Sequence, residues 1–203
     1  MRKITIASAC LCALSAAHIV SADTIVQSGI LSGGLGTENH QVILNQFDTQ
    51  GGLLQLNFVQ IDFLTSVIGG YETDGSGTPV HIHVELSTAW SLNGNPLSNL
   101  QAMVDTIVPN TSPGAATVFN TDTDQVVFDQ AATLSPWIGA GQITLDAVTF
   151  FDVYEDPAKI INFGAGGSAR YTVTYDYSAV PAPGGLAAIV GSLLINRARR
   201  RAN

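Results

Sequence analysis

Apolar and polar residues alternate along most of the chain between residues 24 and 178, with the period of two that is typical of β-strands. The clearest case is the segment 170–178, in which four apolar or aromatic residues fall on one face and polar residues on the other. The residues on the first face are Tyr171, Val173, Tyr175 and Tyr177. This alternation predicts a half-buried strand.

The same pattern predicts further strands in segments separated by turn residues. They are expected over residues 24–31, 41–47, 80–87, 103–108, 115–119, 125–128 and 142–154, with one long or two consecutive strands over 53–68. The turns are expected at Gly33-Gly34, Gly51-Gly52, Gly69-Gly70, 73–79, 93–96, 109–114 and 164–168. A short helical turn is expected over 98–104. Short strands without a long amphipathic helix predict an all-β fold, an antiparallel two-sheet β-sandwich of the jelly-roll kind.

The first 22 residues are typical of a signal peptide. Arg2 and Lys3 precede a mostly apolar run over 4–20, and the small residues before Asp23 predict cleavage between Ala22 and Asp23. The run is shorter than the roughly 20 residues that a membrane-spanning helix needs, so an N-terminal anchor is the less favoured alternative.

The composition of the chain changes after Tyr177. A proline-punctuated linker begins with Val180, Pro181, Ala182 and Pro183, followed by an apolar run over 186–195 and a cluster of arginines at Arg197, Arg199, Arg200 and Arg201. Such a run, short for a permanent anchor, predicts a transient inner-membrane helix whose arginines stay on the cytoplasmic side. We therefore divide the chain into a signal peptide (1–22), a β-sandwich domain (23–178) and a sorting tail (179–203).

The positions of the cysteines and of the charged residues limit the kinds of site that the middle segment can form. Cys10 and Cys12 are the only cysteines and lie in the signal peptide, so the mature chain has no disulfide or thiolate site. All sixteen acidic residues lie between Asp23 and Asp176, against only Lys159 and Arg170, which gives this segment a formal charge of −14. Such a surface disfavours nucleic acid and anionic membranes and favours divalent cations or simple solubility.

The tail resembles the PEP-CTERM sorting signal of Gram-negative bacteria that make exopolysaccharide. Val180, Pro181 and Pro183 match its Val-Pro-Glu-Pro core, and Ala182 gives the Val-Pro-Ala-Pro form common in planctomycete proteins. The resemblance implies processing by a membrane protease of the exosortase class, and release or attachment at the cell surface.

The middle segment resembles the choice-of-anchor E family of exported domains. The resemblance is carried by residues 44–48 and 51–56, by 134–139 with Gly141, and by 171–175. It implies a secreted, surface or matrix protein without known activity, and the Val-Pro-Ala-Pro form of the tail implies a planctomycete-like bacterium.

The segment around His81 is the first candidate site. Alternation places His81, His83 and Glu85 on one face of a strand, with neighbours about 6.5–7 Å apart, so that the three side chains could meet at one metal ion. A complete site would need His40 or a carboxylate from a neighbouring strand. The alternative is an ordinary solvated strand face.

The acidic segment 120–129 is the second candidate, because Asp122 and Asp124 supply the hard oxygen ligands that calcium prefers if the segment is a loop. The alternative is a plain acidic turn. Trp90 and Trp137, with Tyr71 and Tyr154, could stack on sugar rings if exposed, although such residues commonly fill a sandwich core.

The chain has no Gly-x-Ser-x-Gly nucleophile elbow and no glycine-rich phosphate loop. We therefore expect no enzyme but an exported structural or interaction domain of the cell surface or matrix, without a cofactor. The alternative is a carbohydrate- or calcium-binding module that holds exopolysaccharide. A metal-dependent extracellular enzyme using the histidines ranks last.

Overall fold

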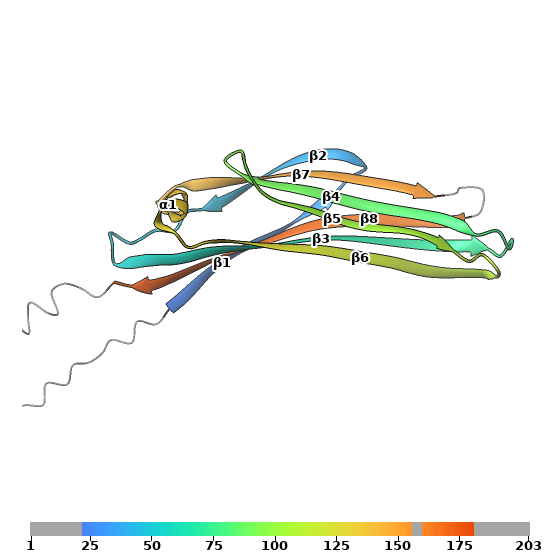
Figure 1. The fold of residues 1–203 in the computed structure, drawn as a ribbon, viewed down its shortest axis with the longest axis horizontal. Coiled ribbons are helices and arrows are strands. Elements are labelled where there is room, and N and C mark those ends of the chain that lie inside the picture. The colour runs from blue at the N-terminus through green and yellow to red at the C-terminus, as the bar shows by residue number, and fades with distance from the viewer. Residues whose placement is uncertain (1–21, 156–159, 181–203) are drawn as a thin grey trace, which may run out of the picture. The chain divides into compact units, whose positions relative to one another are not determined.

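The computed structural model describes residues 22–155 and 160–180, except for the side chains of Glu155, Ile160 and Ile161. The described residues form strands and one short helical segment (Figure 1). The strands are β1 (Ala22–Gly33), β2 (Gly36–Asn45), β3 (Leu54–Asp74), β4 (Val80–Leu92), β5 (Asn95–Val108), β6 (Pro113–Phe128), β7 (Gln142–Glu155) and β8 (Ile160–Ala179). The helical segment consists of α1 (Ala131–Leu134) and the 3₁₀ turn Ser135–Trp137.

The strands pair into two antiparallel four-stranded sheets, β1-β8-β3-β6 and β2-β7-β4-β5, which lie as two layers (Figure 1). Each strand of one sheet has its counterpart in the other, because β1 and β2, β8 and β7, β3 and β4, and β6 and β5 occupy the same positions in the two orders. This strand order is that of a jelly roll. The prediction of an all-β, antiparallel two-sheet sandwich is confirmed.

Alternation explains which residues fill the space between the layers. Along β4 every second residue from Val80 to Leu92 is buried, and along β8 Val173 and Tyr175 are buried while their neighbours lie nearer the solvent. One core cluster surrounds Trp90 and Trp137, and a second surrounds Leu86 and Phe151. Burial of these side chains is the main favourable contribution to folding.

The predicted helical turn over 98–104 is wrong, because these residues lie within β5. Leu, Gln, Ala and Met are good helix formers, and that local propensity suggested a helix. Leu100 and Ala102 instead point into the core, and the backbone pairs with β4 from Val80 to Leu92. Pairing and burial outweigh the propensity. The helix that the structure does contain, α1, was not predicted.

Two predicted turns, Gly69-Gly70 and 164–168, are also wrong, because they lie inside β3 and β8. Gly69 and Gly167 face the other sheet. A Cβ atom added at Gly167 would come within 3.0 Å of Leu86, and one added at Gly69 within 3.2 Å of Val84. These glycines therefore make room for large side chains of β4, which is a recognised reason for glycine within a strand.

The segments that carry the family resemblance come together at one end of the sandwich. The Gln46 side chain donates to the carbonyl of Pro136 and accepts from the amide of Gly141. The Phe47 amide donates to the Trp137 carbonyl at 2.7 Å. Burial raises the pKa of Tyr175 to about 12, so its hydroxyl stays protonated and donates to Asn45 at 2.9 Å. The residues of these segments thus close the sandwich, which is a structural role.

Side chains also close the two long sides of the sandwich, where edge strands of opposite sheets meet. On one side the Gln27 amide pairs with both the N–H and the C=O of Asn45. On the other side Asp122 accepts from the backbone N–H of Gln101 at 3.0 Å, and the Asn120 side chain donates to the Met103 carbonyl at 2.7 Å. Because unpaired strand edges invite other chains to add, these contacts protect β2 and β5.

The expectation of a loop over residues 120–129 is therefore wrong. Residues 113–128 form the single strand β6, where two shorter strands, 115–119 and 125–128, had been expected. Asp122 and Asp124 lie two positions apart on this strand, on the side that faces the other sheet. Asp122 accepts from the edge of β5, and the two carboxylates lie on an extended strand instead of in a loop.

Replacing Asp122 by alanine is expected to lower the free energy of unfolding by about 1 kcal/mol, because the backbone N–H of Gln101 loses its hydrogen-bond acceptor. Asp124→Ala is the matched control. Both carboxylates accept from the amide of the next residue, but only Asp122 reaches across to β5. Urea unfolding and hydrogen exchange at the backbone N–H of Gln101 measure the difference between the two variants. Equal effects of the two substitutions would contradict the assigned role.

The described residues Ala22–Val180 form one compact unit. Ala22 pairs with Ser178, so β1 begins beside the end of β8, and the Val180 amide donates to Leu53 at 2.8 Å. No helix of 18 or more residues with the apolar character of a membrane span occurs within 22–155 or 160–180. The predicted signal peptide, up to residue 21, and the predicted sorting tail from Pro181, with Ala182, Pro183 and the four arginines, lie outside the described residues.

Candidate functional site

The candidate site lies on the outer face of the sheet β2-β7-β4-β5. Because Val80, Ile82 and Val84 point into the core, the residues between and after them, His81, His83 and Glu85, point outward as predicted. Strand β5 contributes a further residue, Asp105, directly opposite His83.

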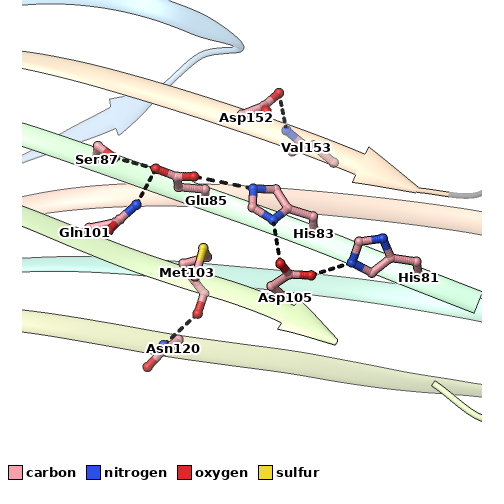
Figure 2. Close-up of polar contacts among 10 residues, drawn as sticks. All are labelled: His81, His83, Glu85, Ser87, Gln101, Met103, Asp105, Asn120, Asp152 and Val153. Carbon is pink, nitrogen blue, oxygen red and sulfur yellow. Dashed lines mark hydrogen bonds and ion pairs between the residues drawn. The ribbon is translucent and has the colours of Figure 1, made fainter. Parts of the chain in front are cut away.

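These four side chains form a continuous row, here called the histidine–carboxylate ladder: His81, Asp105, His83 and Glu85 (Figure 2). His81 Nε2 contacts Asp105 Oδ1, and the other oxygen of Asp105 lies 3.8 Å from His83 Nδ1. His83 Nε2 lies 3.4 Å from Glu85 Oε2. Each histidine therefore has a carboxylate beside it, and Asp105 lies between the two imidazoles.

The ladder continues into neutral residues at its Glu85 end. The Ser87 hydroxyl and the side-chain NH₂ of Gln101 both donate to Glu85 Oε1, at 2.7 and 2.8 Å (Figure 2). These two hydrogen bonds, followed by the neighbouring His83, hold the pKa of Glu85 below its usual value. The hydrogen bond from His81 is the main reason that the pKa of Asp105 is also lowered. Both carboxylates are consequently ionised at neutral pH.

The arrangement differs from the predicted meeting of His81, His83 and Glu85 at one point. The carboxylates alternate with the imidazoles along the strand, and no three His, Cys, Asp or Glu side chains within 22–155 and 160–180 form a group suited to a metal ion. His40, the other histidine considered as a ligand, lies on the inner side of β2, where its Nε2 lies 3.1 Å from Thr149 Oγ1. It belongs to the opposite face of the sheet.

Asp105 is the residue of this site that the sequence did not single out. Its signal was present, because Asp105 alternates with the inward-facing residues of β5 and the polar face of β4 needed a partner strand. The expected helical turn over 98–104 obscured the pairing of the two strands, so the register between His83 and Asp105 was not apparent.

The aromatic residues considered for sugar stacking are placed differently from one another. Trp90 and Trp137 are fully buried, and Trp90 stacks on Phe63 with a ring separation of 4.8 Å. Tyr154 is exposed, and its ring lies 5.7 Å from that of His81. The two tryptophans therefore belong to the core, as the alternative interpretation held.

Comparisons with known proteins add little to this picture. No protein-family model matches the chain, and no curated protein matches it. The chain is 13% identical to a chain of infectious bursal disease virus, Gx strain, with a TM-score of 0.27, covering 80% of this chain and 37% of that one. For Desmodium yellow mottle tymovirus the values are 10% identity, a TM-score of 0.24 and coverage of 80% and 92%. A chain of turnip yellow mosaic virus is 11% identical, with a TM-score of 0.23 and coverage of 91% of this chain and 94% of that one. Likenesses this weak carry no argument, and the jelly-roll assignment follows from the strand order alone.

Proposed function

We propose that this chain is an exported, non-catalytic β-sandwich that acts as a structural or interaction domain at the cell surface or in the extracellular matrix. The observation that carries the proposal is the position of the two ends of the compact unit. Ala22 and Ser178 pair on neighbouring strands, so the two ends of the folded unit lie side by side, which suits a domain with a sorting segment at each end.

The packing of the unit supports this proposal. The strands of the compact unit are paired, its sides are closed by Gln27 and Asp122, and its core forms without a disulfide. A domain of this kind suits an external medium, where it must remain folded without help from the cell. The charge of −14 between Asp23 and Asp176 keeps such a domain soluble.

The tail supplies the other half of the proposal. Its apolar run and four arginines would hold the chain transiently in the inner membrane, with the domain outside, until an exosortase-type protease cuts near Pro183. The proposed partners are the sorting protease and, outside the cell, exopolysaccharide.

The intact mass of the protein tests this scheme. Expressed in a Gram-negative host that makes exopolysaccharide and an exosortase, the chain is expected to begin at Asp23 and to lack Arg197 and the arginines after it. A variant with all four arginines replaced by alanine should escape processing, because its apolar run is no longer held at the membrane. A wild-type protein that reaches the surface with its arginines attached would contradict the proposal.

A further inference from the structure

A shallow trough of about 490 Å³ lies on the outer face of the sheet β2-β7-β4-β5, next to the Glu85 end of the histidine–carboxylate ladder. Its floor consists of small residues of β4, one wall of apolar residues of β7, and the other wall of amides of β5. The strand register places them in two parallel rows, Phe150–Ser87–Gln101 and Val148–Ala89–Asn99.

The two rows repeat the same chemistry along the strands. Each contains a bulky apolar side chain, a small side chain and an amide, and successive outward residues of a strand lie about 6.5–7 Å apart. That spacing is comparable to the length of one sugar ring. The trough can therefore hold two consecutive units of a polymer that runs along β4.

The apolar wall is open to solvent. Phe150 is 42% exposed and Val148 is 41% exposed. Aromatic rings of this kind pack against flat apolar surfaces, such as the C–H face of a pyranose ring. Because Ser87 and Ala89 have small side chains, the ring of Phe150 is accessible from the middle of the trough.

The amide wall offers hydrogen-bonding groups of both kinds. The Asn99 side chain makes no hydrogen bond to any residue that the structure describes, so its carbonyl and NH₂ are both available. The Gln101 NH₂ is held by Glu85, which fixes the side chain and leaves its carbonyl oxygen as an acceptor. The Asn99 NH₂ can donate, and the carbonyl oxygens of Asn99 and Gln101 can accept, which suits the hydroxyl groups of a sugar.

Charge decides which polymer the trough suits. The six residues of its two rows carry no charge, but carboxylates lie at both ends, Glu85 and Asp152 at one and Asp146 at the other. Arg170 is the one permanently charged cation among the described side chains, and it lies on the outer face of the other sheet. An anionic polymer would be repelled, and so would a second copy of this acidic domain.

We propose that this trough binds a neutral polysaccharide, with Phe150 packing against a sugar ring and Asn99 and Gln101 bonding its hydroxyl groups. This inference rests on the proposed function, since an exported domain meets such polymers outside the cell. It differs from the sugar site considered from the sequence, whose two tryptophans are buried.

Affinity electrophoresis of the purified full-length chain tests the proposal. The gels contain laminarin, dextran or mannan as neutral probes and alginate as an anionic probe. We expect at least one neutral polymer to retard the chain and alginate not to. Phe150→Ala should raise the dissociation constant about tenfold, since an aromatic contact contributes roughly that factor. Ala89→Leu, which keeps the ring but fills the floor, should weaken binding similarly.

Phe119→Ala is the matched control. Phe119 is 66% exposed on the outer face of the other sheet, so the same substitution there should leave retardation unchanged. Thermal unfolding of each variant separates lost binding from lost folding. The proposal is overturned if no neutral polymer retards the chain, if only alginate does, or if Phe119→Ala weakens binding as much as Phe150→Ala. Phe150-dependent dimerisation in size-exclusion chromatography without retardation would also overturn it, in favour of a second copy.

These outcomes are separable from those of the proposed function. A chain that is exported and loses its arginines, but that no neutral polymer retards, would disprove the trough as a glycan site and leave the export scheme intact. A chain that binds in the gel but is never exported would do the reverse.

Discussion

Replacing Trp137 by alanine is expected to lower the free energy of unfolding by about 3–5 kcal/mol, the largest effect of any single substitution considered for this domain. Trp137 is 0% exposed, and its ring lies 5.3 Å from that of Phe128 and 5.9 Å from that of Tyr175. Its carbonyl also accepts the hydrogen bond from Phe47. The substitution empties the closed end of the sandwich, where the segments 44–48, 134–139 and 171–175 meet.

Trp137→Phe is the control for this prediction. The Trp137 indole N–H has no hydrogen-bond partner in the described part of the chain, so phenylalanine loses volume but no hydrogen bond. We expect it to cost clearly less than alanine in urea unfolding monitored by circular dichroism. A loss below about 1 kcal/mol for Trp137→Ala would show that this end is not part of the core.

Gly167→Val is expected to lower the free energy of unfolding by about 2–3 kcal/mol, because the interior has no room for the added atoms. A Cβ at this position would lie 3.0 Å from Leu86 and 3.2 Å from Phe151. Both are core residues of the opposite sheet, so the two sheets would have to move apart or these side chains would have to leave their rotamers.

Gly164→Val on the same strand is the matched control. Nothing lies within 4 Å of a Cβ added at Gly164, which is exposed. Because valine favours strands and glycine does not, this change should be neutral or slightly stabilising. If thermal unfolding showed equal losses for the two variants, close approach of the sheets would not be the reason for glycine at position 167.

Features that depend on a single strand could be predicted from the sequence. Alternation sufficed to predict the strands around residues 80–87, 142–154 and 170–178, because one face of each is buried and the other is not. It also placed His81, His83 and Glu85 on a common outward face. These features depend on one strand at a time, so they can be inferred from local sequence.

The features that were missed depend on how two different strands lie against each other. Gly69 and Gly167 resemble turn residues until the side chains of Leu86 and Val84 are placed opposite them. Asp122 resembles a calcium ligand until β5 is placed beside it. Asp105 joins the ladder only through the register of β5 with β4.

The trough illustrates the same limit. Phe150, Ser87 and Gln101 come from three strands, and no local pattern associates them. Their common position follows from the strand order β7-β4-β5, in which β4 contributes small residues between two bulkier strands. A surface of this kind can be recognised only once the sheet is known.

Unfolding of a chain that begins at Asp23 and ends at Val180 tests most directly the claim that the sandwich is self-sufficient and that both ends serve only as sorting signals. The account predicts a soluble monomer with one cooperative transition in urea and a β-dominated circular dichroism spectrum, as for the full-length chain. An aggregated product, or one without a cooperative transition, would contradict it and place residues outside 23–180 in the folding unit.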